Sequence, residues 1–288
     1  MMQIGIGHPG TIPGVKVQLI LDWAKRADTD PFSSLGSLDR LVFPSYDALI
    51  TLTAAAVVTQ RIRLMTTVLL APLHNAGVLA KQAASLDAFS GGRLTLGVGV
   101  GTREDDFRAA PASWHDRGKR FEAQLEVMKR VWSGQALAED IGPVGPPPVQ
   151  PGGPALLIGG YSQAAIQRVA RWADGFISGG LAPAQAQSLY KLAEESWKAA
   201  GRAGKPRFVA SMYWGLGPNA AERAGAYIRN YYAFMGPTAE QVASSVPSTP
   251  EAVKGVIQAF ADSGVDELMC WPCIPDLDQV DRLAALIR

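Results

Sequence analysis

Two side chains that could move a proton stand directly after short apolar segments of the sequence. His8 follows QIGIG, and Asp39 follows FSSLGSL. An imidazole or a carboxylate held at the end of a strand can serve as a general acid or base. We therefore take His8 and Asp39 as the candidate catalytic residues. A metal-binding barrel would place a second histidine two positions from His8, where Ile6 stands, and no metal site is predicted.

Four further side chains near predicted strand ends are candidates for a substrate pocket. Arg40 stays protonated and cannot act as a general base, so it either holds an anionic group or pairs with Asp39 on the surface. His74 either reaches the same strand ends or lies in a solvated loop. Trp214 and Trp271 could form the wall of an apolar pocket, although isolated aromatic residues are more often part of the core.

The only two cysteines, Cys270 and Cys273, form the motif CWPC. A redox-active CxxC needs its first thiol at the start of a helix, and Pro272 and Pro275 prevent a helix from starting there. One such pair supplies too few ligands for a structural zinc site. A buried strand that ends in a loop is the preferred interpretation.

The stretch SGGRLTLGVGVGTRED, residues 90–105, is rich in glycine. A dinucleotide-binding fingerprint needs GxGxxG, and Glu104 stands where the third glycine belongs. We expect a charged loop to follow, with no helix to receive a pyrophosphate. Gly97, Gly99 and Gly101 then leave one strand face bare, against which a flat ligand could lie. The alternative is that these glycines relieve crowding inside a barrel.

A second glycine-rich turn, LLIGGYSQAA, joins a predicted strand to a predicted helix at residues 156–165. The backbone N–H groups of residues 160–162 and the Ser162 hydroxyl converge there, which suits a phosphate. The alternative is an ordinary strand-to-helix turn in which Ser162 caps the helix.

These residues are positioned by a regular alternation of apolar and amphipathic segments. Eight strands, each followed by one or more helices, on a chain of 288 residues are typical of a (β/α)8 barrel. A doubly wound sheet is the alternative. The predicted strands are 3–7, 32–38, 61–70, 93–100, 155–160, 174–180, 207–217 and 265–272. The predicted helices are 15–27, 46–60, 76–90, 117–134, 162–173, 182–201, 219–234, 249–263 and 277–288.

The bulk composition narrows the function classes. The net charge is +1, so no strong electrostatic attraction to nucleic acid or to an anionic membrane is expected. The first ten residues lack the features of a secretory signal, and no apolar run is long enough to span a membrane. We expect a cytoplasmic protein. The stretch 135–154, rich in proline and glycine, is interpreted as a long loop inside one domain that covers residues 1–288.

The chain resembles the bacterial-luciferase-like flavin oxidoreductases over most of its length. The resemblance is carried by TQRIRLMTTVLLAPLHNAGVLAKQAASLDAFSGGRLTLGVGVG, RGKRFEAQLEVMKRVWSG, ALLIGGYSQAAIQRVARWADGF and GVDEL. It implies a (β/α)8 barrel, often a homodimer, that binds reduced FMN or the deazaflavin coenzyme F-420 at the carboxyl ends of its strands. The positions implied for the flavin ring are Thr67, Val68, Val100 and Gly101, and those implied for its phosphate are Gly159, Gly160, Tyr161 and Ser162.

Two details of this resemblance concern individual residues. In relatives the peptide bond at the position of Thr67–Val68 is cis. Many deazaflavin-using relatives carry Asp-His after the second strand, where this chain has Asp39-Arg40, so their mode of proton handling is not expected here.

The function predicted from this resemblance is that of a flavin-dependent monooxygenase. It would use reduced flavin and O2 on a small organic substrate, with a separate flavin reductase because no NAD(P)H-binding motif is present. The alternatives are a deazaflavin-dependent hydride transfer and a flavin-binding protein without catalysis.

Overall fold

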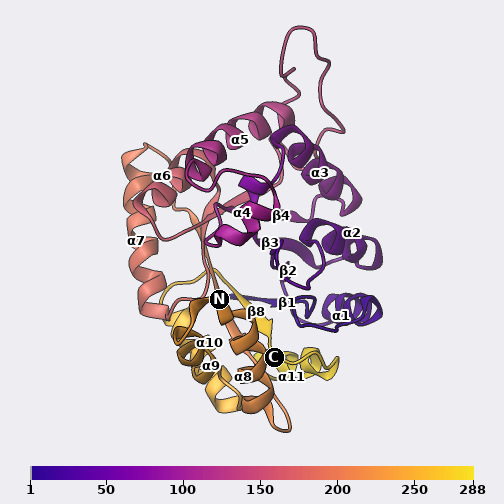
Figure 1. The fold of residues 1–288 in the computed structure, drawn as a ribbon, viewed down its shortest axis with the longest axis vertical. Helices are drawn as coiled ribbons and strands as arrows, with labels where there is room; N and C mark the ends of the chain where they lie inside the picture. Colours follow the sequence, from indigo (N-terminus) through magenta and orange to yellow (C-terminus); the bar gives the residue numbers. More distant parts are fainter. Residues whose placement is uncertain (1) are drawn as a thin grey trace.

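Eight parallel strands close into a barrel in the computed structural model, which describes residues 2–288 (Figure 1). Each strand pairs with its neighbours in sequence, and β8 pairs with β1. The predicted (β/α)8 barrel is confirmed, and a doubly wound sheet is excluded. The strands are β1 Gln3–Gly7, β2 Ser34–Ser37, β3 Arg63–Leu70, β4 Leu94–Gly99, β5 Ala155–Gly159, β6 Gly175–Ser178, β7 Arg207–Trp214 and β8 Glu267–Pro272.

Helices surround this barrel and cover the outer faces of its strands (Figure 1). Several begin where the side chain of an N-cap residue accepts a hydrogen bond from an amide three residues on, namely at Asp47, Asn75, Ser162 and Thr249. The α-helices are α1 Val17–Thr29, α2 Ala48–Val58, α3 Ala76–Phe89, α4 Glu104–Ala109, α5 Arg117–Trp132, α6 Gln163–Trp172, α7 Pro183–Ala199, α8 Ala220–Tyr231, α9 Thr238–Ser244, α10 Pro250–Asp262 and α11 Asp278–Ile287. Two short 3-10 helices are η1 Ala71–Leu73 and η2 Ala233–Met235.

Alternate residues of each strand serve two different cores. The larger core lies between the strands and the helices and includes Phe208, Ala210 and Trp214 of β7. A smaller cluster fills the barrel itself and includes Val209 of β7 and Met269 of β8. Both faces of a barrel strand are buried, which explains why the strands are apolar throughout.

The structure differs from the sequence-based expectation in two connections. Residues 104–109 form helix α4 where a charged loop was predicted. Its first turn holds three acidic residues, which stabilise a helix N-terminus, and Phe107 on the same helix is buried. The second difference is that the predicted helix 219–234 ends as α8 at Tyr231 and is followed by η2 and then by α9, a helix that was not predicted. Residues 135–154 contain no helix or strand, as expected, and form the long loop at the top of Figure 1.

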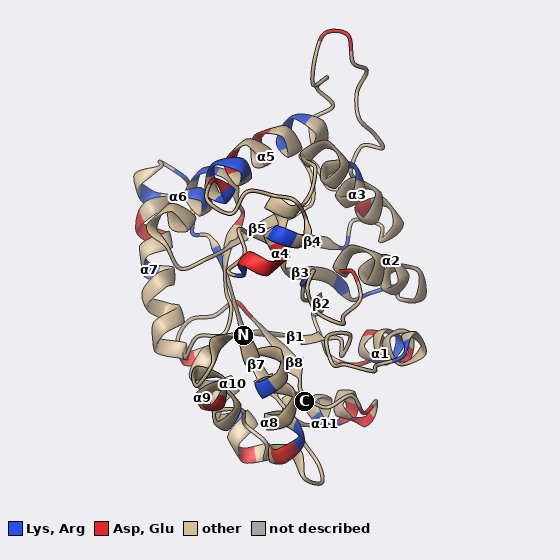
Figure 2. Ribbon diagram, in the orientation of Figure 1, with Lys and Arg blue, Asp and Glu red and all other residues tan. Residues whose placement is uncertain are grey.

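Basic and acidic residues are interspersed along the outer helices in the view of Figure 2. This mixture agrees with the near-neutral net charge of the sequence. Among residues 2–288, no helix combines the length and the apolar character that crossing a membrane requires.

Candidate active site

The carboxyl ends of β3, β4 and β5 form an accessible surface at one end of the barrel. Six residues there are partly exposed although the strands below them are buried: Thr67, Val68, Val100, Gly101, Gly159 and Gly160. We call these six residues the mouth. The peptide bond between Thr67 and Val68 is cis, as the resemblance implies, and the pairing of β3 with β4 shifts register between Thr66 and Leu69.

The glycines of β4 and β5 make room for the irregular part of β3. A Cβ on Gly97 would lie 2.1 Å from the carbonyl oxygen of Thr66, and one on Gly99 would lie 2.8 Å from Cγ2 of Val68. A Cβ on Gly159 would lie 3.0 Å from Cγ1 of Val68. The expectation that Gly97 and Gly99 expose bare backbone to a ligand is therefore wrong. The surface offered at the mouth is Val68 itself.

The turn between β5 and α6 brings several backbone amides to the edge of the mouth. Ser162 caps α6 by accepting a hydrogen bond of 3.3 Å from the Ala165 amide. Gly160 has φ +149°, and a Cβ there would lie 2.7 Å from Cβ of Ala165, so no other residue fits without displacing the helix. The first amides of α6 lack partners within the helix, and Tyr161 and Ser162 are exposed. This turn fits an anionic group.

Tyrosine hydroxyl groups lie close to the two glycines that follow β6, Gly179 and Gly180. The Tyr161 hydroxyl donates to the carbonyl oxygen of Gly179 at 2.5 Å, and the hydroxyls of Tyr213 and Tyr232 share a hydrogen bond of 2.9 Å. Burial raises the pKa of Tyr213 and of Tyr232 above the ordinary value, which keeps both hydroxyls protonated. Sequence reasoning missed Tyr213 and Tyr232, although for Tyr232 the aromatic run AYIRNYYAFM, residues 226–235, was a visible signal.

His8 is buried and fully engaged by the protein. Its Nδ1 accepts the Gly10 amide at 2.9 Å, which leaves the ring proton on Nε2, 2.9 Å from the Ser37 hydroxyl. Burial lowers the pKa of His8 to about 4. The imidazole is neutral and has no nitrogen free for a ligand, so this geometry argues against the predicted catalytic role.

The buried neutral imidazole of His8 makes stability depend on pH. The imidazole has a pKa of about 6.5 in the unfolded chain and of about 4 in the folded protein. Between these two pH values the unfolded chain therefore binds a proton that the folded protein does not bind. The stabilisation is complete above pH 6.5 and is lost as the pH falls toward 4. We expect His8 to account for a decrease of about 2 kcal/mol in the free energy of unfolding between pH 7 and pH 5.

Urea denaturation of the wild type and of His8→Asn at these two pH values measures that contribution. The Oδ1 atom of asparagine takes the place of Nδ1, so the Gly10 amide keeps an acceptor. We expect the variant to lose less stability on acidification than the wild type. Equal losses in both proteins would show that His8 is not the group responsible.

Asp39 and His74 come together beside the mouth. One carboxylate oxygen of Asp39 accepts the Leu70 amide at 2.8 Å and lies 4.0 Å from Nε2 of His74. The side-chain amide of Gln124 donates to the carbonyl oxygens of Ala71 and His74, at 3.0 and 2.6 Å, and so fixes the loop that carries the histidine. His74 is thus not a freely solvated loop residue.

Arg40 does not pair with Asp39 on the surface. Its side chain is buried, its Nε lies 3.7 Å from a carboxylate oxygen of Asp106, and its guanidinium lies against the rings of Phe43 and Tyr231. Asp106 belongs to α4, the helix that the sequence did not reveal. Sequence reasoning therefore missed both this partner and Arg103, which also approaches Asp106.

The two tryptophans face different cores. Trp214 is fully buried among residues of the outer core, so the prediction that it lines a pocket is wrong. Trp271 lies inside the barrel, because a Cβ on Gly7 or Gly36 would lie 2.1 or 3.1 Å from its ring. Its ring fills the interior next to these glycines of β1 and β2.

The CWPC motif behaves as a buried strand followed by a loop. Cys270 and Cys273 are both buried and free of a disulfide, and burial raises the pKa of both thiols above the ordinary value. A redox-active thiol needs the opposite shift, so the structure favours the preferred interpretation over a redox site.

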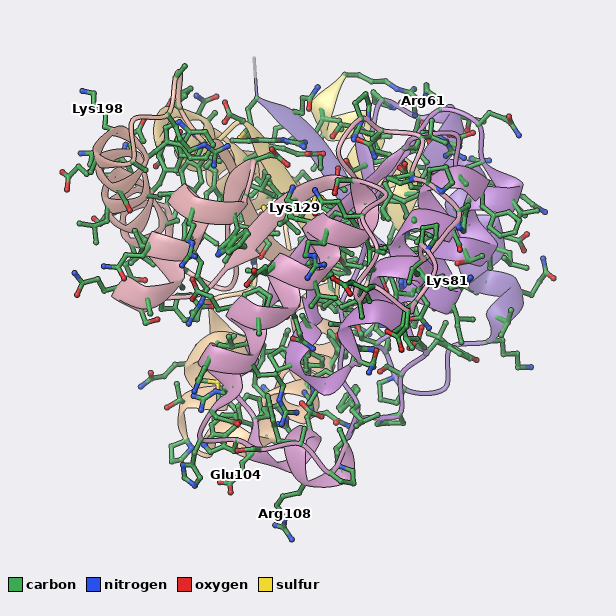
Figure 3. The ribbon with its side chains drawn as sticks, turned by 90° about the horizontal axis from the view of Figure 1, so that it is seen from above. Arg61, Lys81, Glu104, Arg108, Lys129 and Lys198 are labelled. Atoms are coloured by element: carbon green, nitrogen blue, oxygen red, sulfur yellow. The ribbon has the colours of Figure 1, made fainter. Side chains whose placement is uncertain are left out.

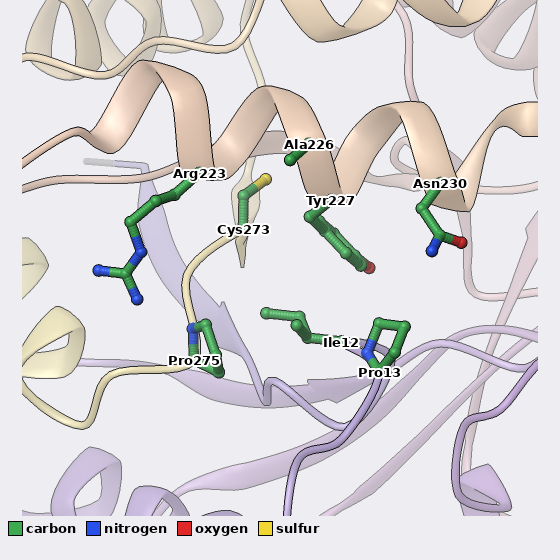
Figure 4. A pocket seen from close by; sticks show the side chains of 8 residues that line it. All are labelled: Ile12, Pro13, Arg223, Ala226, Tyr227, Asn230, Cys273 and Pro275. Atoms are coloured by element: carbon green, nitrogen blue, oxygen red, sulfur yellow. The ribbon is translucent and has the colours of Figure 1, made fainter.

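An open groove of ≈ 360 Å³ lies apart from the mouth, between α8 and the loop after β1 (Figure 4). Ile12, Tyr227 and Cys273 line it, with Arg223 at one end. The Tyr227 hydroxyl is hydrogen-bonded to Thr11 at 2.7 Å, and Arg223 is paired with Asp276. None of the residues predicted to bind the cofactor or the substrate, or to act in catalysis, lines this groove.

Comparison with known proteins agrees with this geometry. The model of the luciferase-like monooxygenase family matches residues 2–271. The chain belongs to this family. Because the matching model describes monooxygenases, this luciferase-like protein is an oxidoreductase.

Individual relatives of this luciferase-like chain cover parts of it. An uncharacterized protein of Mycobacterium tuberculosis is 34% identical over 196 residues, which are 65% of this chain and 68% of that protein. An FMNH(2)-dependent dimethylsulfone monooxygenase of Pseudomonas putida is 30% identical over 132 residues, 42% of this chain and 36% of that protein.

Solved structures match nearly the whole luciferase-like chain. The monooxygenase RslO1 from Streptomyces bottropensis has a TM-score of 0.80 at 21% identity and covers 99% of this chain and 97% of its own. An F420-dependent secondary alcohol dehydrogenase, solved with an F420-acetone adduct, has a TM-score of 0.79 at 17% identity, covering 99% and 98%. At these identities the likeness concerns the fold.

Proposed function

We propose that this protein is a flavin-dependent monooxygenase that uses reduced flavin and O2 on a small organic substrate. One observation carries the proposal. The partly exposed Val68 surface lies next to a helix N-terminal turn that fits a phosphate, so a flat ring with a phosphate tail matches both. The similarity to an FMNH(2)-dependent monooxygenase supports FMN as the cofactor.

The mouth and the adjoining turn between β5 and α6 would hold different parts of the cofactor. Thr67, Val68, Val100 and Gly101 would contact the ring. The Gly160, Tyr161 and Ser162 amides, together with the Ser162 hydroxyl, would hold the phosphate, and Gly159 leads the strand into this turn. A reduced flavin supplies the electrons for oxygen activation when it is bound.

The protein's own side chains supply proton handling and exclude water. His74 carries a ring nitrogen that can hold or release a proton, and its Nε2 lies 4.0 Å from a carboxylate oxygen of Asp39. The buried ring of Trp271 fills the barrel interior and keeps water out of it, which favours reactions that water would intercept. Asp39 is a positioning residue in this arrangement, because it also fixes the Leu70 amide.

The Asp39–His74 pair also supports a second function, hydride transfer with the deazaflavin coenzyme F-420. Many relatives that use this coenzyme place a histidine next to the aspartate in sequence, and here the fold brings a histidine to the aspartate from another loop. Such a reaction needs a proton donor or acceptor but no oxygen.

Oxygen dependence separates these functions. We expect protein loaded with reduced FMN to consume O2 and to oxidise at least one compound in a screen of small organic substrates, with no turnover under anaerobic conditions. Continued turnover without oxygen, using reduced coenzyme F-420, would favour hydride transfer. A cofactor-saturated protein that does neither would be a binding protein without catalysis. A separate flavin reductase would supply the reduced FMN.

We further propose that a second copy of this chain covers helix α2. The helix contains no charged residue, and its inner face packs on the barrel through Leu49, Leu52 and Ala55. Its outer face carries Ile50 and Val57, which are 72% and 66% exposed. A helix that is apolar all round is normally buried on all sides.

Charge on this outer face is expected to break a homodimer. The double variant Ile50→Lys, Val57→Lys should sediment as a monomer at concentrations where the wild type is a dimer. Leu192→Lys, at an exposed apolar position of α7 on the other side of the barrel, should leave the dimer intact (Figure 1). A wild type that stays monomeric at micromolar concentration would refute the proposal.

A further inference from the structure

Two largely buried arginines approach one carboxylate next to the mouth. The side chains of Arg40, Arg103 and Asp106 are 6%, 12% and 1% exposed. One oxygen of Asp106 accepts the amides of Leu41 and Val42, at 3.1 and 2.7 Å. The other oxygen lies 3.7 Å from Nε of Arg40 and 3.8 Å from Nε of Arg103, too far for a hydrogen bond to either.

The guanidinium groups of this cluster keep donors without a partner. Nε and Nη1 of Arg40 and Nε of Arg103 are buried and make no hydrogen bond. Asp105 contacts Arg103 but is 41% exposed, so solvent screens its charge more than that of Asp106. Two largely buried cations thus face one fully buried anion. Unpaired buried donors on a charged group are costly, and an arginine satisfies them best with a carboxylate or another oxyanion.

Aromatic rings surround the cluster and leave one side accessible. The Arg40 guanidinium lies 4.9 Å from the ring centre of Phe43 and 5.2 Å from that of Tyr231. The Arg103 guanidinium lies 4.1 Å from the ring of Phe234, which is 47% exposed. A small ligand could therefore reach Arg103 by displacing this one exposed ring.

The cluster adjoins the proposed reaction site along the chain. Arg40 directly follows Asp39, and Arg103 follows Gly101 of the mouth by two residues. A ligand whose charged end lies at these arginines would place its uncharged part against aromatic rings and toward the mouth.

We propose that Arg40 and Arg103 bind the carboxylate of an organic acid that carries an apolar body, and that this acid is the substrate class. The inference rests on the proposed function. An acidic group of the cofactor has the same chemistry as such a substrate, so the test is run both without and with bound FMN.

Calorimetric titration with phenylacetate, compared with the neutral isostere phenylacetamide, tests this site. We expect saturable binding of phenylacetate and at least about tenfold weaker binding of the amide. We expect Arg40→Gln and Arg103→Gln each to weaken phenylacetate binding by about tenfold or more. The matched control is Arg108→Gln in α4, the helix that Arg103 precedes, because Arg108 points away from the body of the protein (Figure 3).

Asp106→Asn distinguishes a ligand site from a purely structural cluster. The amide oxygen of asparagine can still accept the Leu41 and Val42 amides, while the competing negative charge is removed. We expect phenylacetate to bind several-fold more tightly to this variant. This readout also decides the case if Arg40→Gln fails to fold, because a structural cluster would show no gain in affinity.

Three results would overturn the proposal: equal binding of acid and amide, unchanged binding in Arg103→Gln, or no gain in Asp106→Asn. Competition of FMN with phenylacetate would also overturn it, because it would assign the arginines to the cofactor. Failure of the proposed flavin-dependent function would give a different result from failure of the arginine site. In that case FMN would not bind to the wild type, while phenylacetate still would.

Discussion

Gly97→Ala is expected to lower the free energy of unfolding by about 3 kcal/mol. The added Cβ would lie 2.1 Å from the carbonyl oxygen of Thr66. That neighbour is backbone rather than the end of a flexible side chain, so β3 and β4 would have to separate. The Thr66 hydroxyl also donates to the Gly97 carbonyl oxygen at 2.7 Å, which ties the two strands together at this point. Chemical denaturation measures the loss.

Gly255→Ala is the matched control for this substitution. Gly255 lies within α10, has no heavy atom within 4 Å of an added Cβ, and should gain up to about 1 kcal/mol from the better helix former. If Gly97→Ala were as stable as the wild type, the close approach of β3 to β4 would be wrong, and with it the shape of the mouth.

Ser162→Asp is expected to weaken FMN binding by about a hundredfold, or about 2.7 kcal/mol. Aspartate caps a helix as well as serine does, and a negative charge in this position favours the helix N-terminus, so the fold should be kept. The same charge would face the phosphate of FMN, and juxtaposed like charges cost several kcal/mol. Flavin titration followed by visible absorption gives the affinity.

Riboflavin, which lacks the phosphate, is the control ligand for Ser162→Asp. Its affinity should be the same for the variant and for the wild type. If FMN bound equally well to both proteins, the phosphate would lie somewhere other than the turn between β5 and α6.

The barrel and its helices were predictable because local patterns determine them. β-branched apolar runs such as residues 61–70 and helix caps such as Asn75 and Ser162 act over a few residues. The ends of β3, β4 and β5 must then meet at one end of a parallel barrel, which is enough to place Thr67, Gly101 and Ser162 in the same region.

The direction in which a strand residue points was not predictable in the same way. Trp214 and Trp271 both lie near strand ends, yet one faces the helices and the other faces the barrel interior. Both faces of a barrel strand are apolar. The residue pattern of β7 and β8 therefore does not indicate which side chains point into the barrel and which point toward the helices. Only the pairing of β8 with β1, which sets Trp271 against Gly7, decides it.

Contacts between distant loops were equally hidden. Arg40 stands next to Asp39 in sequence but pairs with Asp106, and Asp39 pairs with His74 instead. These two contacts depend on where the strands end relative to one another and on the position of α4. This helix has six residues, which is too short to give a clear periodic signal in the sequence. The glycines of β4 were misassigned for the same reason, because their neighbour is the irregular segment of β3.

Titration of the purified, folded protein with FMN and with coenzyme F-420, followed by visible absorption and fluorescence, tests the central claim most directly. The account predicts saturable binding of at least one of them, with a spectral shift that Ser162→Asp diminishes for FMN. Absence of binding by both cofactors to a protein that is shown to be folded would contradict it.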